Sequence, residues 1–274
     1  MKQLFILLFF TLQLSFAQNI KIQIKSDFPS QTIWVKKMLQ QSTKYLNNMF
    51  LNENVKLPKK ILVTIKKNSK LNGIRANARR VDNSINFTSN VWQKDKYRIW
   101  IMIHELVNLL SSYYGSNGYP SDWWANGRSP FPEYISVLIM QKLGFKSEAL
   151  WRKSVHKDKS DHKFYWTLHK KFGIKLFRDF FSLMKKHKID LNKIGKRWPH
   201  PDKKRTVVTL SLLSIASNTN LAKVATYYKI GQKPKDWHKR HPEIKFKPYT
   251  ISIQEIEDMI YKIKNNVPLH NTHF

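Results

Sequence analysis

The stretch WIMIHELVNLLSSYYG (100–115) places a histidine and a glutamate side by side on a strongly apolar segment. Apolar residues surround the pair on most sides, which predicts a buried helix over about 93–113. His104 and Asn108 are one turn apart and share a face, while Glu105 lies about 100° around the axis. The pattern differs at one position from His-Glu-x-x-His, in which two histidines bind zinc and the glutamate acts as general base.

The residues before this helix have the pattern of an α+β unit. Residues 20–26 and 59–67 alternate between apolar and polar side chains, which predicts two half-buried strands. Residues 30–50 carry apolar side chains at helical spacing. Residues 73–80 and 83–89 alternate more weakly on either side of a turn-like Val-Asp-Asn, which predicts a hairpin. A small mixed sheet with helices is therefore expected.

The residues after the helix are predicted to be mainly helical. Gly144 ends the first of these helices, which is entered through prolines, and a Ser252–Glu255 capping box begins the last. The predicted helices cover 129–144, 161–173, 174–187, 204–217, 219–231 and 252–264. We therefore divide the chain into an α+β subdomain, 18–115, and a helical subdomain, 116–274.

A second segment, DWWANGRSPFPEYIS (122–136), is rich in side chains that recognise ligands. Tryptophan faces with a nearby amide and guanidinium suit a peptide or a glycan. The alternative is structural: either tryptophan packs between the two subdomains, and the arginine pairs with Asp122 or Glu105. The candidate cleft residues on this segment are Trp123, Trp124, Asn126, Arg128 and Glu133.

In their order and spacing, HELVN and WWANG resemble the gluzincin metallopeptidases, the thermolysin-like and aminopeptidase-like zincins. In that family a mixed sheet precedes the His-Glu-x-x-His helix, and a Trp-x-x-Glu-Gly segment about twenty residues later supplies another ligand. A helical half then completes the cleft. The likeness covers most of the chain in layout and is residue-specific across about 100–140. It implies a zincin-like α+β fold, with His104 as metal ligand and Glu105 as catalytic base.

Two departures from the family pattern affect the metal. Asn108 and Asn126 stand where the family has histidine and glutamate. Amide oxygens bind zinc weakly, and a catalytic zinc normally has three strong ligands. We therefore expect no cofactor and a non-catalytic peptide- or glycan-binding protein. The alternative is an active zinc metallopeptidase with a shifted ligand set that draws on Asp122, Glu133, His156, His162 or His169.

The charge of the chain supports a third hypothesis. Lys and Arg number 49 against 18 Asp and Glu, which gives a net charge of +31. Such a field favours anionic partners, as in a basic envelope or adhesion protein that binds anionic surfaces or polymers. The lysines are spread along the whole chain without an arginine block or a nucleic-acid motif, so no specific nucleic-acid partner is expected.

The N-terminus has the pattern of a secretory signal peptide. Lys2 precedes the apolar run 4–16, and Ala17 offers a cleavage site. Cleavage after Ala17 would make the protein secreted or periplasmic. Its 0 Cys exclude lipid attachment through a cysteine and any disulfide. No later apolar run reaches the roughly 20 residues of a transmembrane helix, so an integral membrane protein is not expected.

Overall fold

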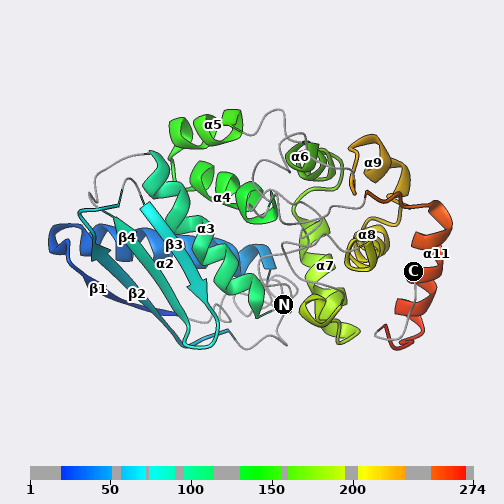
Figure 1. Cartoon of the computed structure of the whole chain (residues 1–274), viewed down its shortest axis with the longest axis horizontal. Helices are drawn as coiled ribbons and strands as arrows, with labels where there is room; N and C mark the ends of the chain where they lie inside the picture. The colour runs from blue at the N-terminus through cyan, green and yellow to red at the C-terminus, as the bar shows by residue number, and fades with distance from the viewer. Residues whose placement is uncertain are drawn as a thin grey trace, which may run out of the picture.

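The computed structural model is an α+β protein with a small mixed sheet and a larger number of helices (Figure 1). This confirms the predicted class and the mainly helical composition of the second half. The proposed signal peptide and most of the segment 122–136 lie outside the described residues. The structure describes residues 20–50, 57–71, 74–89, 96–113, 130–155, 160–194, 203–231 and 248–269.

The sheet has four strands in the order β1-β2-β4-β3. β1 (Lys21–Ser26), β2 (Lys60–Lys67) and β4 (Ser84–Ser89) run parallel to one another. β3 (Ile74–Arg79) pairs antiparallel with β4 and forms an edge of the sheet. The two strands and the hairpin predicted from alternation are therefore confirmed, and the hairpin places its first strand at the edge.

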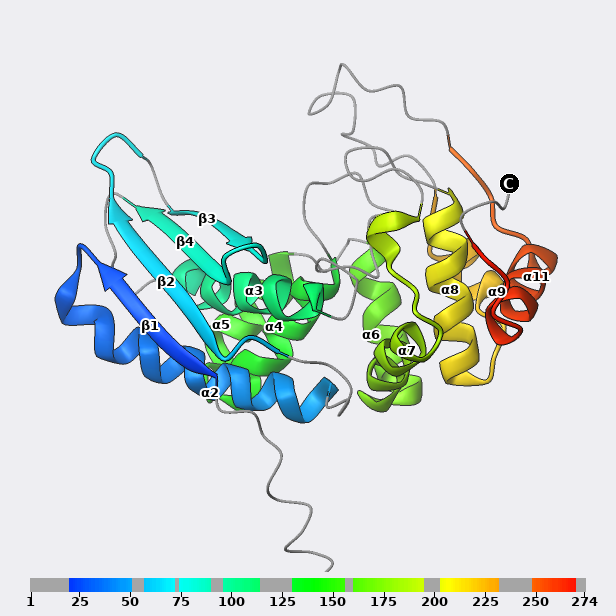
Figure 2. The same cartoon turned by 90° about the horizontal axis from the view of Figure 1, so that it is seen from below.

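One face of the sheet is apolar and packs on helices. Inward residues of neighbouring strands meet in register, as Ile22 meets Ile61 and Val63 meets Ile85, and these side chains are buried. Helix α2 (Thr32–Phe50), which follows a 3₁₀ turn at Pro29–Gln31, covers this face beside β1. Helix α3 (Lys96–Ser112) covers it beside β3, and Figure 2 shows both helices on the same side.

Besides α2, helices α4 (Pro130–Lys142) and α5 (Lys146–Val155) pack directly on α3. Helix α4 begins with a proline, which costs nothing at a first turn, and carries Glu133 in that turn. The chain turns out of this helix at Gly144, whose φ of +87° suits glycine, and the Phe145 N–H donates to the Met140 carbonyl at 2.9 Å. Helix α5 follows at once and was not predicted from the sequence.

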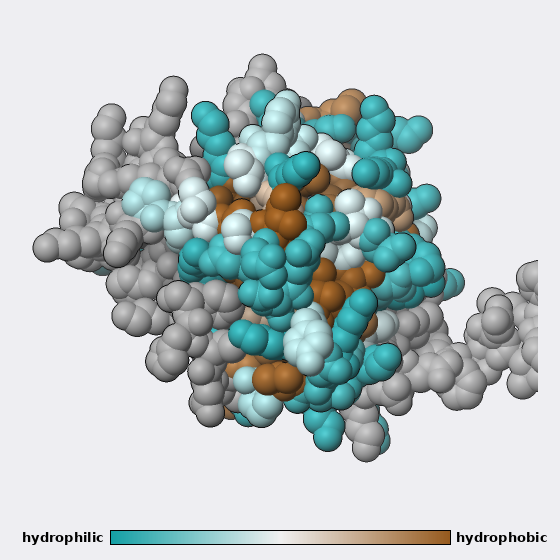
Figure 3. All heavy atoms as spheres, turned by 90° about the vertical axis from the view of Figure 1, so that its right-hand side faces the viewer, coloured by the Kyte–Doolittle hydropathy of each residue, from teal (hydrophilic) through white to brown (hydrophobic). Residues whose placement is uncertain are grey.

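The remaining helices form the other end of the molecule (Figure 1). Of these, α11 begins with the predicted capping box, in which Ser252 and Glu255 exchange backbone hydrogen bonds. The helix predicted over 219–231 is shorter than expected. Seen from this end, apolar residues lie in separate groups among hydrophilic ones (Figure 3). The helices are α6 (Ser160–Phe172), α7 (Lys175–Lys186), α8 (Lys203–Ser217), α9 (Ala222–Tyr227) and α11 (Ile253–Lys264), with a 3₁₀ turn at Leu191–Lys193.

None of the described helices is both long enough and apolar enough to cross a membrane.

Candidate functional site

The site lies on α3, where that helix meets the sheet and α4. The side chains of Met102, Ile103 and Leu106 are buried around it, so the helix is fixed in the core as its composition predicted. His104 and Glu105 are also buried, with exposed fractions of 8% and 7%. Two ionisable side chains in such a place need polar partners, because an unpaired buried charge is costly.

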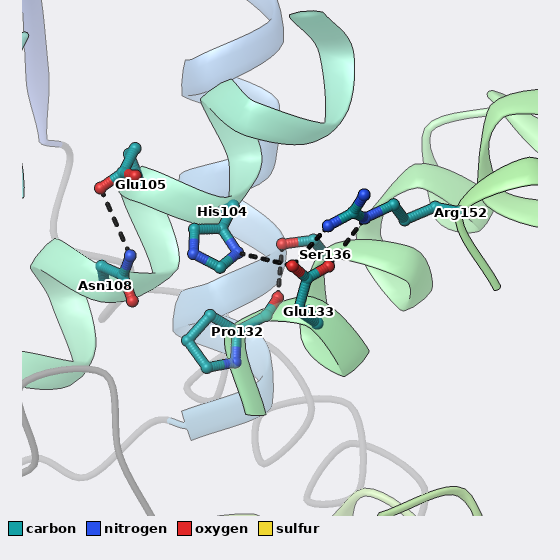
Figure 4. Close-up of polar contacts among 7 residues, drawn as sticks. All are labelled: His104, Glu105, Asn108, Pro132, Glu133, Ser136 and Arg152. Carbon is teal, nitrogen blue, oxygen red and sulfur yellow. Dashed lines mark hydrogen bonds and ion pairs between the residues drawn. The ribbon is translucent and has the colours of Figure 1, made fainter. Parts of the chain in front are cut away.

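Glu105 is held by groups from its own helix and from the edge strand. The Asn108 side-chain amide donates to the Glu105 carboxylate at 3.3 Å, one helical turn along α3 (Figure 4). The backbone of Ala78, on β3, lies close enough to this carboxylate to lower its pKa. The pKa of Glu105 is raised from 4.5 to about 7, mainly by burial and to a small extent by nearby Glu133, while the Asn108 hydrogen bond and the Ala78 backbone act in the opposite direction.

Glu133 forms a buried ion pair with an arginine that the sequence did not single out. Arg152, on α5, donates from Nε to Glu133 Oε2 at 2.8 Å and from Nη2 to Glu133 Oε1 at 2.5 Å. Their side chains are 1% and 3% exposed. The Arg152 guanidinium also lies 3.5 Å from the ring centroid of Trp100. A two-pronged bond and a cation–π contact therefore fix this carboxylate in one orientation.

His104 lies between these two carboxylates. Its Nδ1 is 4.0 Å from Glu133 Oε1, and its ring centroid is 5.0 Å from that of Trp100. Figure 4 shows the other ring nitrogen directed toward the side of Asn108 and Glu105. A carboxylate facing Nδ1 favours the tautomer that carries the proton there, which leaves Nε2 as an acceptor on the opposite side.

The residues of this site do not fit a zinc ion. Nε2 of His104 is a strong donor, but Asn108 supplies only an amide that is bonded to Glu105. Both oxygens of Glu133 are engaged by Arg152, and Nδ1 of His169 is bonded to the Tyr134 hydroxyl. Within the described ranges no group of three His, Asp or Glu side chains is placed to hold a metal. A catalytic zinc needs about three strong ligands.

The structure brings together the predicted residues His104, Glu105, Asn108 and Glu133 (Figure 4). Two further candidates, His162 and His169, lie on α6 and are not part of this group. The remaining candidates lie outside the described residues, and these are Asp122, Trp123, Trp124, Asn126, Arg128 and His156. Sequence reasoning missed Trp100 and Arg152. Trp100 precedes His104 by one turn and shares its face, so helical spacing offered a signal for it. Arg152 offered none, because it depends on how α5 packs.

We compared the whole chain with known proteins. No family model, no curated protein and no solved structure matches it.

The raised pKa of Glu105 predicts a pH-dependent stability. In the unfolded chain this carboxyl ionises near 4.5, but in the folded protein it ionises near 7. The folded state therefore binds the proton more tightly, and stability falls as the pH rises from 4.5 through 7. Glu105→Gln has no such loss. Relative to the original protein, we expect the variant to gain on the order of 2–3 kcal/mol more free energy of unfolding at pH 8.5 than at pH 5.

Urea unfolding at both pH values measures this difference. Glu257→Gln, on the exposed face of α11, is the matched control and should unfold like the original protein at both. An identical effect of Glu105→Gln at pH 5 and pH 8.5 would show that Glu105 ionises normally in the folded protein.

Proposed function

We propose that this chain is a secreted or periplasmic, metallopeptidase-like protein that binds an extended peptide and does not hydrolyse it. The contact between Glu105 and the backbone N–H of Ala78 carries the proposal, because it joins the His-Glu helix to an edge strand. The layout agrees with a zincin-like fold. A mixed sheet precedes a buried His-Glu helix, and a helical half follows.

The direction of the Ala78 N–H identifies the groups that a peptide would meet. The Ala78 backbone acts on the Glu105 carboxylate of α3, so we infer that its N–H is directed away from β4. Backbone groups alternate in direction along a strand, so those of Ala76 and Ile74 also point outward from β3. No other described strand pairs with this edge. An extended peptide can add to such an edge as a further strand, with its backbone running beside His104 and Glu105.

The chemistry of the site favours binding over hydrolysis. In the family that the chain resembles, the glutamate acts on a water activated by a metal with three strong ligands. Here the corresponding turn of α3 carries an amide, and Glu133 is neutralised by Arg152. The remaining groups are a histidine acceptor and a carboxylate, which are suited to hydrogen bonding with a ligand backbone.

One observation favours an active metallopeptidase as the second candidate. A carboxyl with a pKa of about 7 is well matched to proton transfer near neutral pH. Cleavage of a quenched fluorescent peptide mixture, lost in Glu105→Gln and in a chelator, would establish that function. Absence of cleavage together with peptide binding would establish the first.

Peptide binding along β3 predicts the effect of a proline at Ala76. Proline removes one N–H from the outer edge, and it is tolerated on an edge strand where that N–H faces solvent. We expect Ala76→Pro to keep the circular dichroism spectrum of the original protein. Peptide binding should weaken by about tenfold or more, because one carbonyl of the bound peptide loses its hydrogen-bond donor. The measurement is fluorescence anisotropy with peptides selected from a random heptapeptide library.

Ala76→Ser retains the N–H and is the control, with binding expected within about twofold of the original. Peptides that bind Ala76→Pro as tightly as they bind the original chain would rule out the β3 edge as their site.

A further inference from the structure

The face of the sheet opposite α2 and α3 is open to solvent, and its side chains are polar. Because side chains alternate along a strand, the residues next to the buried ones point to this face, and the register aligns them across strands. No described helix lies against it (Figures 1 and 2). The outward side chains are Lys21, Gln23, Lys25, Lys60, Leu62, Thr64, Lys66, Arg75, Asn77, Arg79, Ser84, Asn86 and Thr88.

An open face is unusual for this kind of sheet. β1, β2 and β4 are parallel, and parallel strands are generally covered on both faces, where they are apolar on both sides. These strands are instead apolar only toward the helices. Among their outward side chains Leu62 is the one aliphatic residue, and it is half-buried. The sequence therefore fits a face whose partner is water or another polar molecule.

Charge and hydrogen-bonding groups are arranged in two zones on this face. The cations, all exposed, lie at its ends and sides, and the only outward charges on the four strands are positive. One of them, Arg79, lies 3.6 Å from Asp82 in the hairpin turn. The centre carries the half-buried, uncharged side chains of Gln23, Thr64, Asn86 and Thr88. Successive outward residues are about 7 Å apart along a strand and about 5 Å apart across strands. The outward cations are Lys21, Lys25, Lys60, Lys66, Arg75 and Arg79.

We propose that this open face of the sheet binds an acidic polysaccharide. Amide and hydroxyl groups at the centre match sugar hydroxyls in being both donors and acceptors. The surrounding cations match carboxylate or sulfate groups along the chain. The outward positions hold no aromatic ring on which a nucleic-acid base could stack. Their one large apolar side chain, Leu62, is half-buried among polar neighbours and offers little to a lipid layer.

The proposed surface is separate from the peptide site. The peptide would pair with the outer edge of β3 beside α3, whereas most of the cations belong to β1 and β2. Substitutions on β1 and β2 therefore test the polysaccharide without touching the groups assigned to the peptide. The two proposals can fail independently.

The whole chain is basic, so the test has to separate this face from the general charge. One variant replaces Lys21, Lys25, Lys60 and Lys66 by glutamine. The control variant replaces Lys163, Lys170, Lys186 and Lys223, which are exposed on α6, α7 and α9, and so loses the same formal charge. Binding to a heparin octasaccharide is measured at about 0.15 M salt, where distant charges are screened.

We expect the face variant to bind heparin about tenfold or more weakly, with a smaller salt dependence, and the control variant to change by less than about twofold. Equal weakening in both variants would overturn the proposal, because binding would then follow net charge alone. A single-stranded thymidine oligonucleotide and vesicles of anionic phospholipid are the other probes. The choice of a polysaccharide would be overturned if the original protein bound either probe as tightly as heparin and the face variant did not.

Discussion

Replacing Arg152 by methionine will destabilise the protein by about 3–5 kcal/mol, the cost of leaving a buried carboxylate without its partner. Glu133 is 1% exposed and receives both of its short hydrogen bonds from this guanidinium. Methionine fills a similar volume, so the decrease in the free energy of unfolding comes mainly from the unpaired carboxylate and less from a cavity. The stack of the guanidinium on Trp100 disappears as well. Urea unfolding of the variant measures the change.

A second substitution distinguishes an unpaired charge from lost packing. In Glu133→Gln/Arg152→Met the carboxylate is gone, and we expect most of the stability to return, since removing both partners is often close to neutral. Lys146→Met, at an exposed position on the same helix α5, should change stability by no more than about 0.5 kcal/mol. A double variant as unstable as the single one would contradict the ion-pair explanation.

Asn108→His will create zinc binding where the original chain has almost none. The new imidazole lies one turn from His104 on the same face of α3, so two strong nitrogen ligands replace one. Nδ1 of His104 faces Glu133, which leaves Nε2 directed toward the new side chain (Figure 4). We expect the affinity for zinc to rise by on the order of a hundredfold in isothermal titration, with one zinc per chain.

His104→Ala on the Asn108→His background is the control for this result. It retains the added histidine and the other surface histidines but removes the pair, so the gain should vanish. An equal gain with His104 absent would place the new zinc elsewhere on the chain. No gain in either variant would mean that positions 104 and 108 do not face one site.

Much of the fold was predictable because the sequence alternates or repeats at the right periods. The strands near 20–26 and 59–67 and the hairpin alternate between apolar and polar side chains, and the His-Glu helix is a long segment that is apolar on most sides. Helix α5 has neither pattern, which explains why it was missed. Its buried residues are Ala149 and Arg152, while Leu150 is exposed. An apolar pattern cannot reveal a helix whose inward face is built around a guanidinium.

The candidate site was predictable only where helical spacing determines it. His104, Glu105 and Asn108 share one helix, so their relative positions follow from the sequence. Glu133 was a candidate cleft residue and a candidate ligand, but its partner depends on how α4 and α5 pack. That partner, Arg152, is 19 residues away. Because Arg152 donates to both oxygens of Glu133, this carboxylate belongs to a structural ion pair and does not serve as a metal ligand.

The zinc content of the purified protein tests the central claim most directly. The claim is that the site keeps the layout of a metallopeptidase without the ligands that hold its metal. Purified protein would be equilibrated with micromolar zinc, dialysed and analysed by mass spectrometry. Our account predicts far less than one zinc per chain, with no change in His104→Ala. One tightly held zinc per chain that is lost in His104→Ala would contradict it.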